Sequence, residues 1–331
     1  MNPFLVVPVA LLYLAQQPVP RHSATPAAQQ ATSAAALLEG VAIQVALDRA
    51  GFSSGVIDGR PGANTRRAME AYKQQKSADI VPEAAPLVDY QITAADVAGP
   101  FVENIPADVI EQSKLPALGY RSIVEMLAER FHTTPDFLRK LNSSSTFAAD
   151  TTIQVPNVEP LVLPAPVAPT AKEDTPTGTS GRGAASAAVP MPGKPDVVVQ
   201  VSKASSSLTV TDASGAIVFF APVTTGSEHD PLPIGEWKVN GVQLNPTFKY
   251  NPALFWDANP QHSKATIPAG PNSPVGLVWI DISKEHYGLH GAPEPSQIGR
   301  TESHGCVRLT NWDALRVAAL VKPGTRIAFT E

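Results

Sequence analysis

A proline-rich segment divides this chain of 331 residues into two parts with different sequence patterns. Residues 159–195 carry prolines on both sides of a Gly/Ser/Thr-rich stretch, the composition of a spacer that is partly extended and partly flexible. Before the spacer, apolar residues recur at helical spacing; after it, they form short β-rich runs. The chain is also too long for one ordinary hydrophobic core, so we expect a multidomain protein.

The charge balance excludes two classes of partner. Charged residues make up 17% of the chain, and the formal net charge is −5. This balance implies no large basic surface, so neither nucleic acid nor anionic lipid is an expected partner.

The N-terminus resembles a secretory signal. Residues 1–22 contain an apolar run from Phe4 to Ala15, which is too short to span a bilayer and close in length to a signal-peptide core. No basic residue precedes this run and no clear cleavage site follows it, so cleavage stays open. No later stretch reaches the roughly eighteen apolar residues of a membrane helix. We therefore expect an exported protein of the periplasm or cell envelope.

Residues 23–80 predict a tether and a first small module. Residues 23–36 are rich in Ala, Gln, Ser and Thr without apolar periodicity, which predicts a flexible tether. In residues 37–80, Leu38, Val41 and Val45 follow helical spacing, and Asn64 or Thr65 can cap a second helix. The runs "QVALDRAGF", "GVIDGRPGANT" and "RRAMEAYKQ" resemble a small three-helix peptidoglycan-binding domain. The alternative is a solvated helical hairpin.

Residues 112–158 predict two helices and a strand. Ser122 and Glu125 form a capping box, Thr134 and Pro135 begin a second helix, and "TTIQVPN" follows as a short strand. This order resembles the later part of a LysM-like module, a binder of cell-wall glycan, without a recognisable opening strand. The alternative is a small helical spacer.

Residues 196–331 predict a predominantly β domain. Runs such as "DVVVQVS", "SLTVTD", "AIVFFAPV" and "LVWIDIS" alternate with turn signals at intervals that suit a sandwich or barrel. Only "TNWDALRVAALV" predicts a helix, with Thr310 and Asp313 as its capping pair.

The only cysteine of the chain, Cys306, lies in this β domain, in the run "SHGCVRL". It could be a small buried hydrophobic residue, or a nucleophile activated by a nearby base. His304 and His290 are candidate bases, and the Gly291 carbonyl could accept from His290 Nδ1–H and orient the ring. The amides of Gly305 and Cys306 are natural donors to an oxyanion.

Two kinds of ligand are conceivable for this segment, a metal ion and a substrate carboxylate. A zinc site is not expected, because the chain has one Cys, no CxxC and no HxxxH, and no cofactor is expected either. Arg308 shares the strand face of Cys306 if the strand continues, where it could pair a substrate carboxylate.

The run "HGAPEPSQIGRTESHGCVRL" resembles the signature of the L,D-transpeptidase catalytic domain of the YkuD type, and "VTTGSEHDPLPIGEWKV", "NPTFKYNP" and "GPNSPVGLVWIDIS" resemble its upstream blocks. The resemblance covers about residues 196–331 and implies a β-sandwich with a cysteine nucleophile that acts on peptidoglycan stem peptides. It implies Cys306 as nucleophile, His290 as base and Gly291 as orienting carbonyl. Arg308 stands where one form of the pattern has Asn. The remaining residues assigned to the pocket, the oxyanion hole or substrate binding are Ser303, His304, Gly305, Tyr287 and Arg300.

The implied reaction has two steps. The thiolate attacks the tetrapeptide stem and releases D-Ala, and an acceptor then takes the acyl group. The acceptor is a stem amine, a lipoprotein lysine, or water, which would make the protein an L,D-carboxypeptidase. β-Lactams, and carbapenems above all, should trap the thioacyl enzyme. The alternatives are a non-catalytic peptidoglycan-binding protein and a metal-dependent hydrolase. We expect a monomer.

Overall fold

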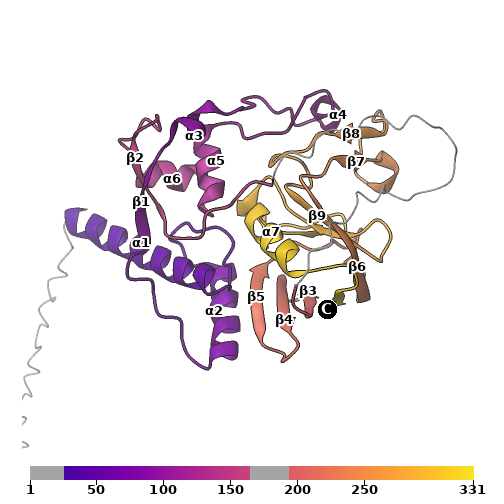
Figure 1. Cartoon of the computed structure of the whole chain (residues 1–331), viewed down its shortest axis with the longest axis horizontal. Helices are drawn as coiled ribbons and strands as arrows, with labels where there is room; N and C mark the ends of the chain where they lie inside the picture. Colours follow the sequence, from indigo (N-terminus) through magenta and orange to yellow (C-terminus); the bar gives the residue numbers. More distant parts are fainter. Residues whose placement is uncertain (1–25, 165–193) are drawn as a thin grey trace, which may run out of the picture. The chain divides into compact units, whose positions relative to one another are not determined.

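The computed structural model describes residues 26–164 and 194–331 (Figure 1). The signal-like segment 1–22 and all but the ends of the predicted spacer 159–195 lie outside the described residues. In the described part of the chain, no helix is both long and apolar enough to cross a bilayer.

The first two helices are α1, Pro26–Arg49, and α2, Ala63–Lys76. The prediction of a flexible tether over residues 23–36 is wrong from Pro26 onward, because α1 begins there. Alanine and glutamine lose little side-chain freedom in a helix, so this stretch extends the helix that follows it. The predicted end of α1 is confirmed: Gly51 has a φ of +83° and donates its N–H to the Asp48 carbonyl over 3.0 Å.

Helix α2 begins without the side-chain cap expected from Asn64 or Thr65, so that prediction is wrong. Its N-cap is Gly62, which makes no side-chain hydrogen bond. The Asn64 amide donates to the Ile298 carbonyl over 3.0 Å, and the buried Thr65 hydroxyl accepts from Gln44. Long-range contacts therefore engage both side chains away from the helix terminus.

The next unit has a strand at each end. Its elements are β1 (Leu87–Gln91), α3 (Ala94–Ala98), α4 (Val109–Gln112), α5 (Ile123–Arg130), α6 (Pro135–Leu141) and β2 (Thr152–Pro156). β1 and β2 pair antiparallel. Because β1 precedes residue 112, the unit extends beyond the predicted range 112–158, and residues 92–122 separate the opening strand from α5. The predicted helix starts are present, since the Ser122 and Thr134 side chains accept from the N–H groups of Glu125 and Phe137.

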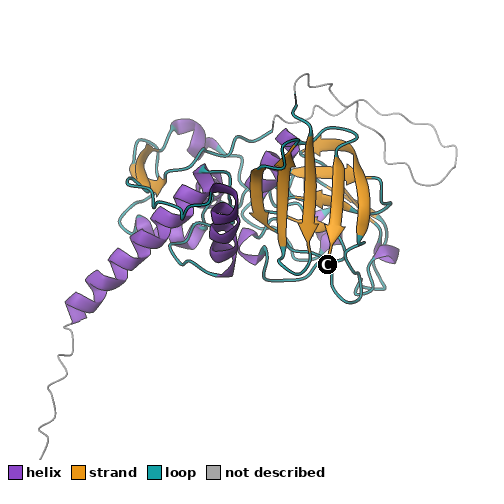
Figure 2. Cartoon of the chain, turned by 90° about the horizontal axis from the view of Figure 1, so that it is seen from below, coloured by secondary structure: helices purple, strands orange, loops and turns teal. Residues whose placement is uncertain are grey.

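The domain after the spacer is built on one eight-stranded sheet (Figure 2). In sheet order the strands are β11 (Val307–Arg308), β10 (Gly288–His290), β9 (Val278–Ile282), β6 (Gly235–Leu244), β12 (Arg326–Thr330), β3 (Val197–Ser202), β4 (Ser207–Asp212) and β5 (Ile217–Pro222). A separate pair comprises β7 (Phe248–Tyr250) and β8 (Ala265–Ile267). Two 3-10 helices span Pro252–Leu254 and Pro295–Gln297, and α7 spans Asn311–Leu320, capped as predicted by Thr310, whose side chain accepts from Asp313 N–H.

Strand β6 serves both halves of the sheet. Its residues 235–238 pair with β12 and its residues 239–244 pair with β9, with a register shift between Val239 and Gly241. A bulge lets one strand bend and continue from one half of a sandwich into the other. The predicted β-rich fold of residues 196–331 is confirmed, and its two halves are one continuous hydrogen-bonded sheet.

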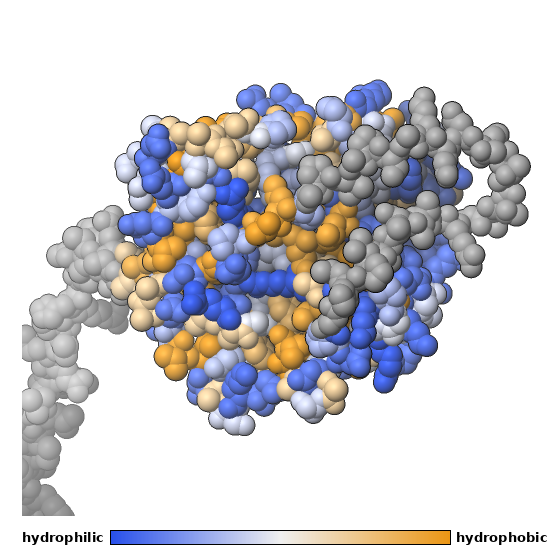
Figure 3. All heavy atoms as spheres, viewed as in Figure 1, coloured by the Kyte–Doolittle hydropathy of each residue, from blue (hydrophilic) through white to orange (hydrophobic). Residues whose placement is uncertain are grey.

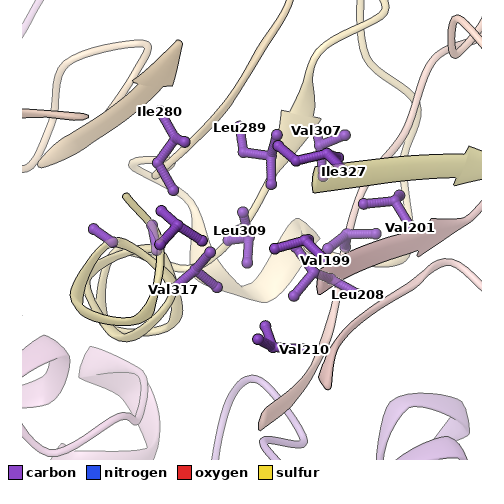
Figure 4. Packing of buried hydrophobic residues seen from close by; sticks show 14 of the residues in the cluster. Val199, Val201, Leu208, Val210, Ile280, Leu289, Val307, Leu309, Val317 and Ile327 are labelled. Atoms are coloured by element: carbon purple, nitrogen blue, oxygen red, sulfur yellow. The ribbon is translucent and has the colours of Figure 1, made fainter. Parts of the chain in front are cut away.

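The hydrophobic core of this domain joins both halves of the sheet to α7. Val199 and Leu208 come from β3 and β4, Ile280 and Leu289 from β9 and β10, and Val317 from α7; all five are fully buried (Figure 4). The helix therefore closes one side of the sheet and brings its N-terminus close to the end of β10, which it also contacts.

The N-terminal units and the β domain share buried contacts. Phe52 and Phe220 stack within one hydrophobic cluster. Asp48 on α1 accepts two hydrogen bonds from Arg316 on α7, over 2.9 and 2.8 Å, and one from His132 over 3.1 Å. Burial raises the pKa of the Asp48 carboxyl, but His132 and Arg316 outweigh burial and hold this pKa well below its usual range. The buried Asp48 carboxylate thus connects α1 to α7 through its hydrogen bonds with Arg316.

The surface carries scattered hydrophobic side chains. On the face shown in Figure 3 they lie in small groups among hydrophilic ones. Val81, Val162 and Trp256 are the most exposed large hydrophobic residues of the described chain. Single exposed residues of this kind are ordinary on protein surfaces.

Candidate active site

Strand pairing places Cys306 and His290 on one face of the sheet. β10 and β11 are parallel, with Leu289 opposite Val307 and His290 opposite Arg308. Leu289 and Val307 are fully buried in the core, and side chains alternate between faces along a strand. His290, Arg308 and Cys306, which directly precedes β11, therefore lie on the face opposite the core.

The His290 ring is held in one orientation. Its Nδ1–H donates to the Gly291 carbonyl oxygen over 2.6 Å, the hydrogen bond expected from the sequence. Trp279, the cross-strand neighbour of His290 on β9, stacks on the ring with centroids 5.5 Å apart and planes at 19°. Burial, together with the charge of Arg308, lowers the pKa of His290 to about 4. At neutral pH the ring is uncharged, and its free Nε2 can accept a proton.

Cys306 is a protonated thiol at neutral pH. Its side chain is half-buried, and the protein around it raises the pKa of the thiol to about 11 by desolvation, more than the Gly288 N–H and Arg308 lower it. The thiol lies 3.8 Å from the His286 carbonyl. A neutral thiol and a neutral imidazole on one face of a sheet can act as a general-base pair, in which the proton leaves as the sulfur attacks.

The turn before Cys306 requires glycine. Gly305 has a φ of +94°, and a Cβ there would lie 2.5 Å from Tyr287 Cε1. Tyr287 packs against this turn, and burial raises the pKa of its phenol, with smaller contributions from Asp230 and Cys306. Ser303 is buried, and its hydroxyl donates to the Cys306 carbonyl over 2.6 Å. Ser303 therefore shapes the turn, and Tyr287 forms its wall.

The His304 side chain contacts Asp257 and Phe255. Its Nε2 is 2.9 Å from Asp257 Oδ1, and its ring meets Phe255 edge to face with centroids 5.1 Å apart. Of the two candidate bases, His290 is therefore the one whose surroundings suit a base for Cys306. Arg300 is exposed and lines a small cavity with Gln44 and Asn64, so its assignment to substrate binding stays a prediction.

Arg308 has an unused donor. Its backbone pairs with Thr224 through two hydrogen bonds of 2.9 and 3.0 Å, which fix the strand beside the site. Within the described residues its Nε is buried without a hydrogen-bond partner, and burial lowers the pKa of the guanidinium. A buried, unpaired guanidinium N–H next to a nucleophile suits an anionic group of a ligand.

Sequence reasoning missed two residues that shape the site. Trp279 stacks on the catalytic candidate His290, and Gly288 makes room for it, because a Cβ on Gly288 would lie 2.6 Å from Trp279 Cζ2. The available signal was the glycine two positions before His290 in a strand, where a glycine marks close approach of another group. Among the described residues, no group of three or more His, Cys, Asp or Glu side chains could hold a metal ion.

Comparison with known proteins relates the β domain to a known family. The family model described as "L,D-transpeptidase catalytic domain" (YkuD) matches residues 196–328. These residues are a YkuD-type domain. YkuD of Bacillus subtilis, a protein named as an L,D-transpeptidase, is 28% identical to this chain over 142 residues. The match covers 41% of this chain and 71% of that protein.

Two further curated relatives match shorter stretches of the chain. YkuD of Bacillus licheniformis is 47% identical over 60 residues, covering 18% of this chain and 36% of that protein. YbiS of Escherichia coli, named a probable L,D-transpeptidase, is 34% identical over 119 residues, covering 34% of this chain and 38% of that protein. The solved structure of L,D-transpeptidase 3 from Mycobacterium tuberculosis with a faropenem-derived adduct is 19% identical, covers 41% of this chain and 61% of that chain, and has a TM-score of 0.34.

Proposed function

We propose that this protein is a peptidoglycan L,D-transpeptidase in which Cys306 is the nucleophile and His290 the base. The observation that carries the proposal is the bond from His290 Nδ1–H to the Gly291 carbonyl, which leaves Nε2 free on the sheet face that also holds Cys306. This is the arrangement that a histidine needs in order to take a proton from a thiol and return it to a leaving group. The match of residues 196–328 to the L,D-transpeptidase catalytic domain supports the same reading.

In the first step, Cys306 Sγ attacks the carbonyl carbon of the third stem residue as its proton passes to His290 Nε2. The developing oxyanion lies where the Gly305 and Cys306 N–H groups can donate to it; neither N–H donates to another described backbone group. The tetrahedral intermediate collapses to a thioester, and D-Ala leaves with the proton from His290.

In the second step an amine attacks the thioester and regenerates the thiol. A stem side-chain amine gives a 3→3 cross-link, a lipoprotein lysine gives anchoring of that protein, and water gives L,D-carboxypeptidase activity. We favour a stem amine, because it is present on the same polymer as the donor.

Arg308 is proposed to bind a carboxylate of the donor stem. The unpaired Nε of its half-buried guanidinium supports this role, since two guanidinium N–H groups can meet a carboxylate side by side. Tyr287, which forms the wall beside Gly305, is proposed to contact the same stem.

The parts outside the YkuD-type domain suit delivery to the cell wall. The sequence resemblance of residues 37–80 to a peptidoglycan-binding domain supports binding of wall glycan. The antiparallel pairing of β1 with β2, with α3, α4, α5 and α6 between them in the chain, supports it as well. We therefore propose an exported monomer that works in the cell envelope. The alternative of a non-catalytic wall-binding protein predicts an unreactive Cys306.

The decisive test incubates the whole purified protein with a carbapenem and measures its intact mass. We expect one adduct on the wild type and none on Cys306→Ala; absence of an adduct from the wild type would refute the proposed nucleophile. A second measurement supplies disaccharide-tetrapeptide and distinguishes dimer formation from release of D-Ala alone.

A further inference from the structure

The peptide unit that holds His290 is packed from two sides. The accepting carbonyl belongs to the Gly291–Ala292 peptide. A Cβ on Gly276 would lie 2.7 Å from the Gly291 carbonyl carbon and 2.8 Å from the Ala292 nitrogen, and a Cβ on Gly291 would lie 2.1 Å from Asn311 Oδ1. Neither gap has room for a side chain. The Gly276 backbone and the Asn311 amide therefore touch this peptide directly and limit its movement.

Asn311, the first residue of α7, is fully buried and uses both ends of its side chain. Its Oδ1 accepts from the Leu277 N–H over 3.0 Å, and its Nδ2 donates to the Pro271 carbonyl over 3.2 Å. Its other acceptor is Glu129 Oε1, at 2.9 Å. Two partners of Asn311 belong to the YkuD-type domain, and the third belongs to the helical unit before the spacer.

Glu129 is itself held in place. It lies in the last turn of α5, which contacts α7 (Figure 1), and only 6% of the residue is exposed. The Tyr120 hydroxyl also donates to its Oε1, over 3.1 Å. Burial raises the pKa of Glu129 to about 8, so at neutral pH its carboxyl is a neutral acceptor. The orientation of the Asn311 amide thus depends on a residue outside the YkuD-type domain.

We propose that Asn311 and Glu129 are positioning residues for His290: Glu129 holds the Asn311 amide, and Asn311 holds the Gly291 peptide that accepts the His290 Nδ1–H. The inference rests on the proposed function, in which His290 is the base. Supporting residues of this kind matter because displacement of a catalytic group by about 1 Å can reduce a rate on the order of 100-fold. The helical unit then completes the active site, besides any role in binding the wall.

The test compares carbapenem acylation of the whole protein in three variants. Glu129→Leu removes one of the two acceptors of Asn311 Nδ2, Glu129→Gln keeps an acceptor at that position, and Ser53→Ala is the matched control. Ser53 is buried, and its hydroxyl donates to Asp313 on α7 over 2.9 Å, so this variant removes one junction hydrogen bond two residues from Asn311. We expect Glu129→Leu to lower the limiting acylation rate about 10- to 100-fold with unchanged half-saturation. Glu129→Gln and Ser53→Ala should stay within about twofold of the wild type.

The His290 Nδ1–H proton gives a readout that does not require activity. Its NMR signal, assigned by its loss in His290→Gln, should shift or broaden in Glu129→Leu and stay unchanged in Ser53→Ala. An unchanged signal and rate in Glu129→Leu, or equal losses in Ser53→Ala, would overturn the inference. A wild type that forms no adduct refutes the proposed function instead, and the NMR comparison still decides the positioning. If Glu129→Leu does not fold, Tyr120→Phe takes its place, because it removes the second hydrogen-bond donor to Glu129. We expect this variant to be acylated about threefold more slowly than the wild type. An unchanged acylation rate would then count against the inference.

Discussion

The reactivity of Cys306 should depend on pH in two different ways, according to the reagent. Alkylation by iodoacetamide requires the thiolate, whereas acylation by a carbapenem can use His290 as the base. Burial raises the pKa of the thiol to about 11 and lowers the pKa of His290 to about 4. Cys306 is the only cysteine in the chain, so both reactions report on one sulfur.

The size of the effect on alkylation follows from the thiol pKa. At pH 7 a thiol of pKa about 11 is ionised to about one part in 10,000, against about 3% for an ordinary cysteine, a difference of roughly 300-fold. A more basic thiolate is also more nucleophilic, which offsets roughly tenfold of this difference. We expect alkylation of Cys306 at pH 7 to be roughly 20- to 30-fold slower than that of a free cysteine. Its rate should rise about tenfold per pH unit up to about pH 10.

Carbapenem acylation should give a flat profile over the same range. His290 is uncharged above its pKa of about 4, so its ability to accept a proton is lost only as the pH falls through that value. His290→Gln should lower the acylation rate on the order of 100-fold or more and restore a tenfold rise per pH unit, because only the rare thiolate then reacts. Circular dichroism at each pH controls for unfolding.

Two outcomes would refute this reasoning. An alkylation profile that levels off below pH 8 would mean that Cys306 and His290 form a thiolate–imidazolium pair before substrate arrives. A wild-type acylation rate that climbs steadily from pH 6 to pH 10 would mean that His290 does not act as the base.

Three further predictions concern the protein's stability and the turn before Cys306. Glu129 should stay protonated up to about pH 8 when folded but ionise near its ordinary pKa when unfolded, so its contribution to the free energy of unfolding should fall between pH 5 and 8. Urea unfolding should show this fall, on the order of a few kcal/mol, as a decrease in the wild-type free energy of unfolding relative to that of Glu129→Gln; the comparison cancels the opposing contribution of His290, whose pKa is lowered. Arg316→Leu leaves the Asp48 carboxylate without its bidentate partner and should cost about 3 kcal/mol in unfolding experiments; a change below about 0.5 kcal/mol contradicts the buried pairing. Gly305→Ala places a Cβ against Tyr287 at a positive φ and should slow carbapenem acylation about tenfold or more, and an unaltered rate would contradict the close packing.

Local signals in the sequence predicted much of the secondary structure. The helix starts at Ser122, Thr134 and Thr310 and the helix end at Gly51 are present, because each depends on a hydrogen bond or a φ value within a few residues. The strands of the β domain also follow their apolar runs.

The sequence-based predictions were wrong mainly where contacts between residues far apart in the chain determine the local structure. Asn64 was expected to cap α2, but its amide bonds to the Ile298 carbonyl, 234 positions away. Strand β1 has no clear pattern of its own and exists because it pairs with β2. The tether prediction for residues 23–36 failed for a different reason: polar composition does not exclude a helix when alanine is abundant.

The sequence by itself determined the reactive groups of this protein. A single Cys306 beside Gly305, with His290-Gly291 upstream, supplies the proposed nucleophile, base and orienting carbonyl in its residue types and order alone. Only the tertiary structure decided how these groups are tuned and supported. Burial makes the thiol and the imidazole both neutral, and Asn311 meets Glu129 from 182 positions away to hold the peptide beside His290. Desolvation and long-range packing come from residues that have no fixed spacing in the chain, so no local pattern records them.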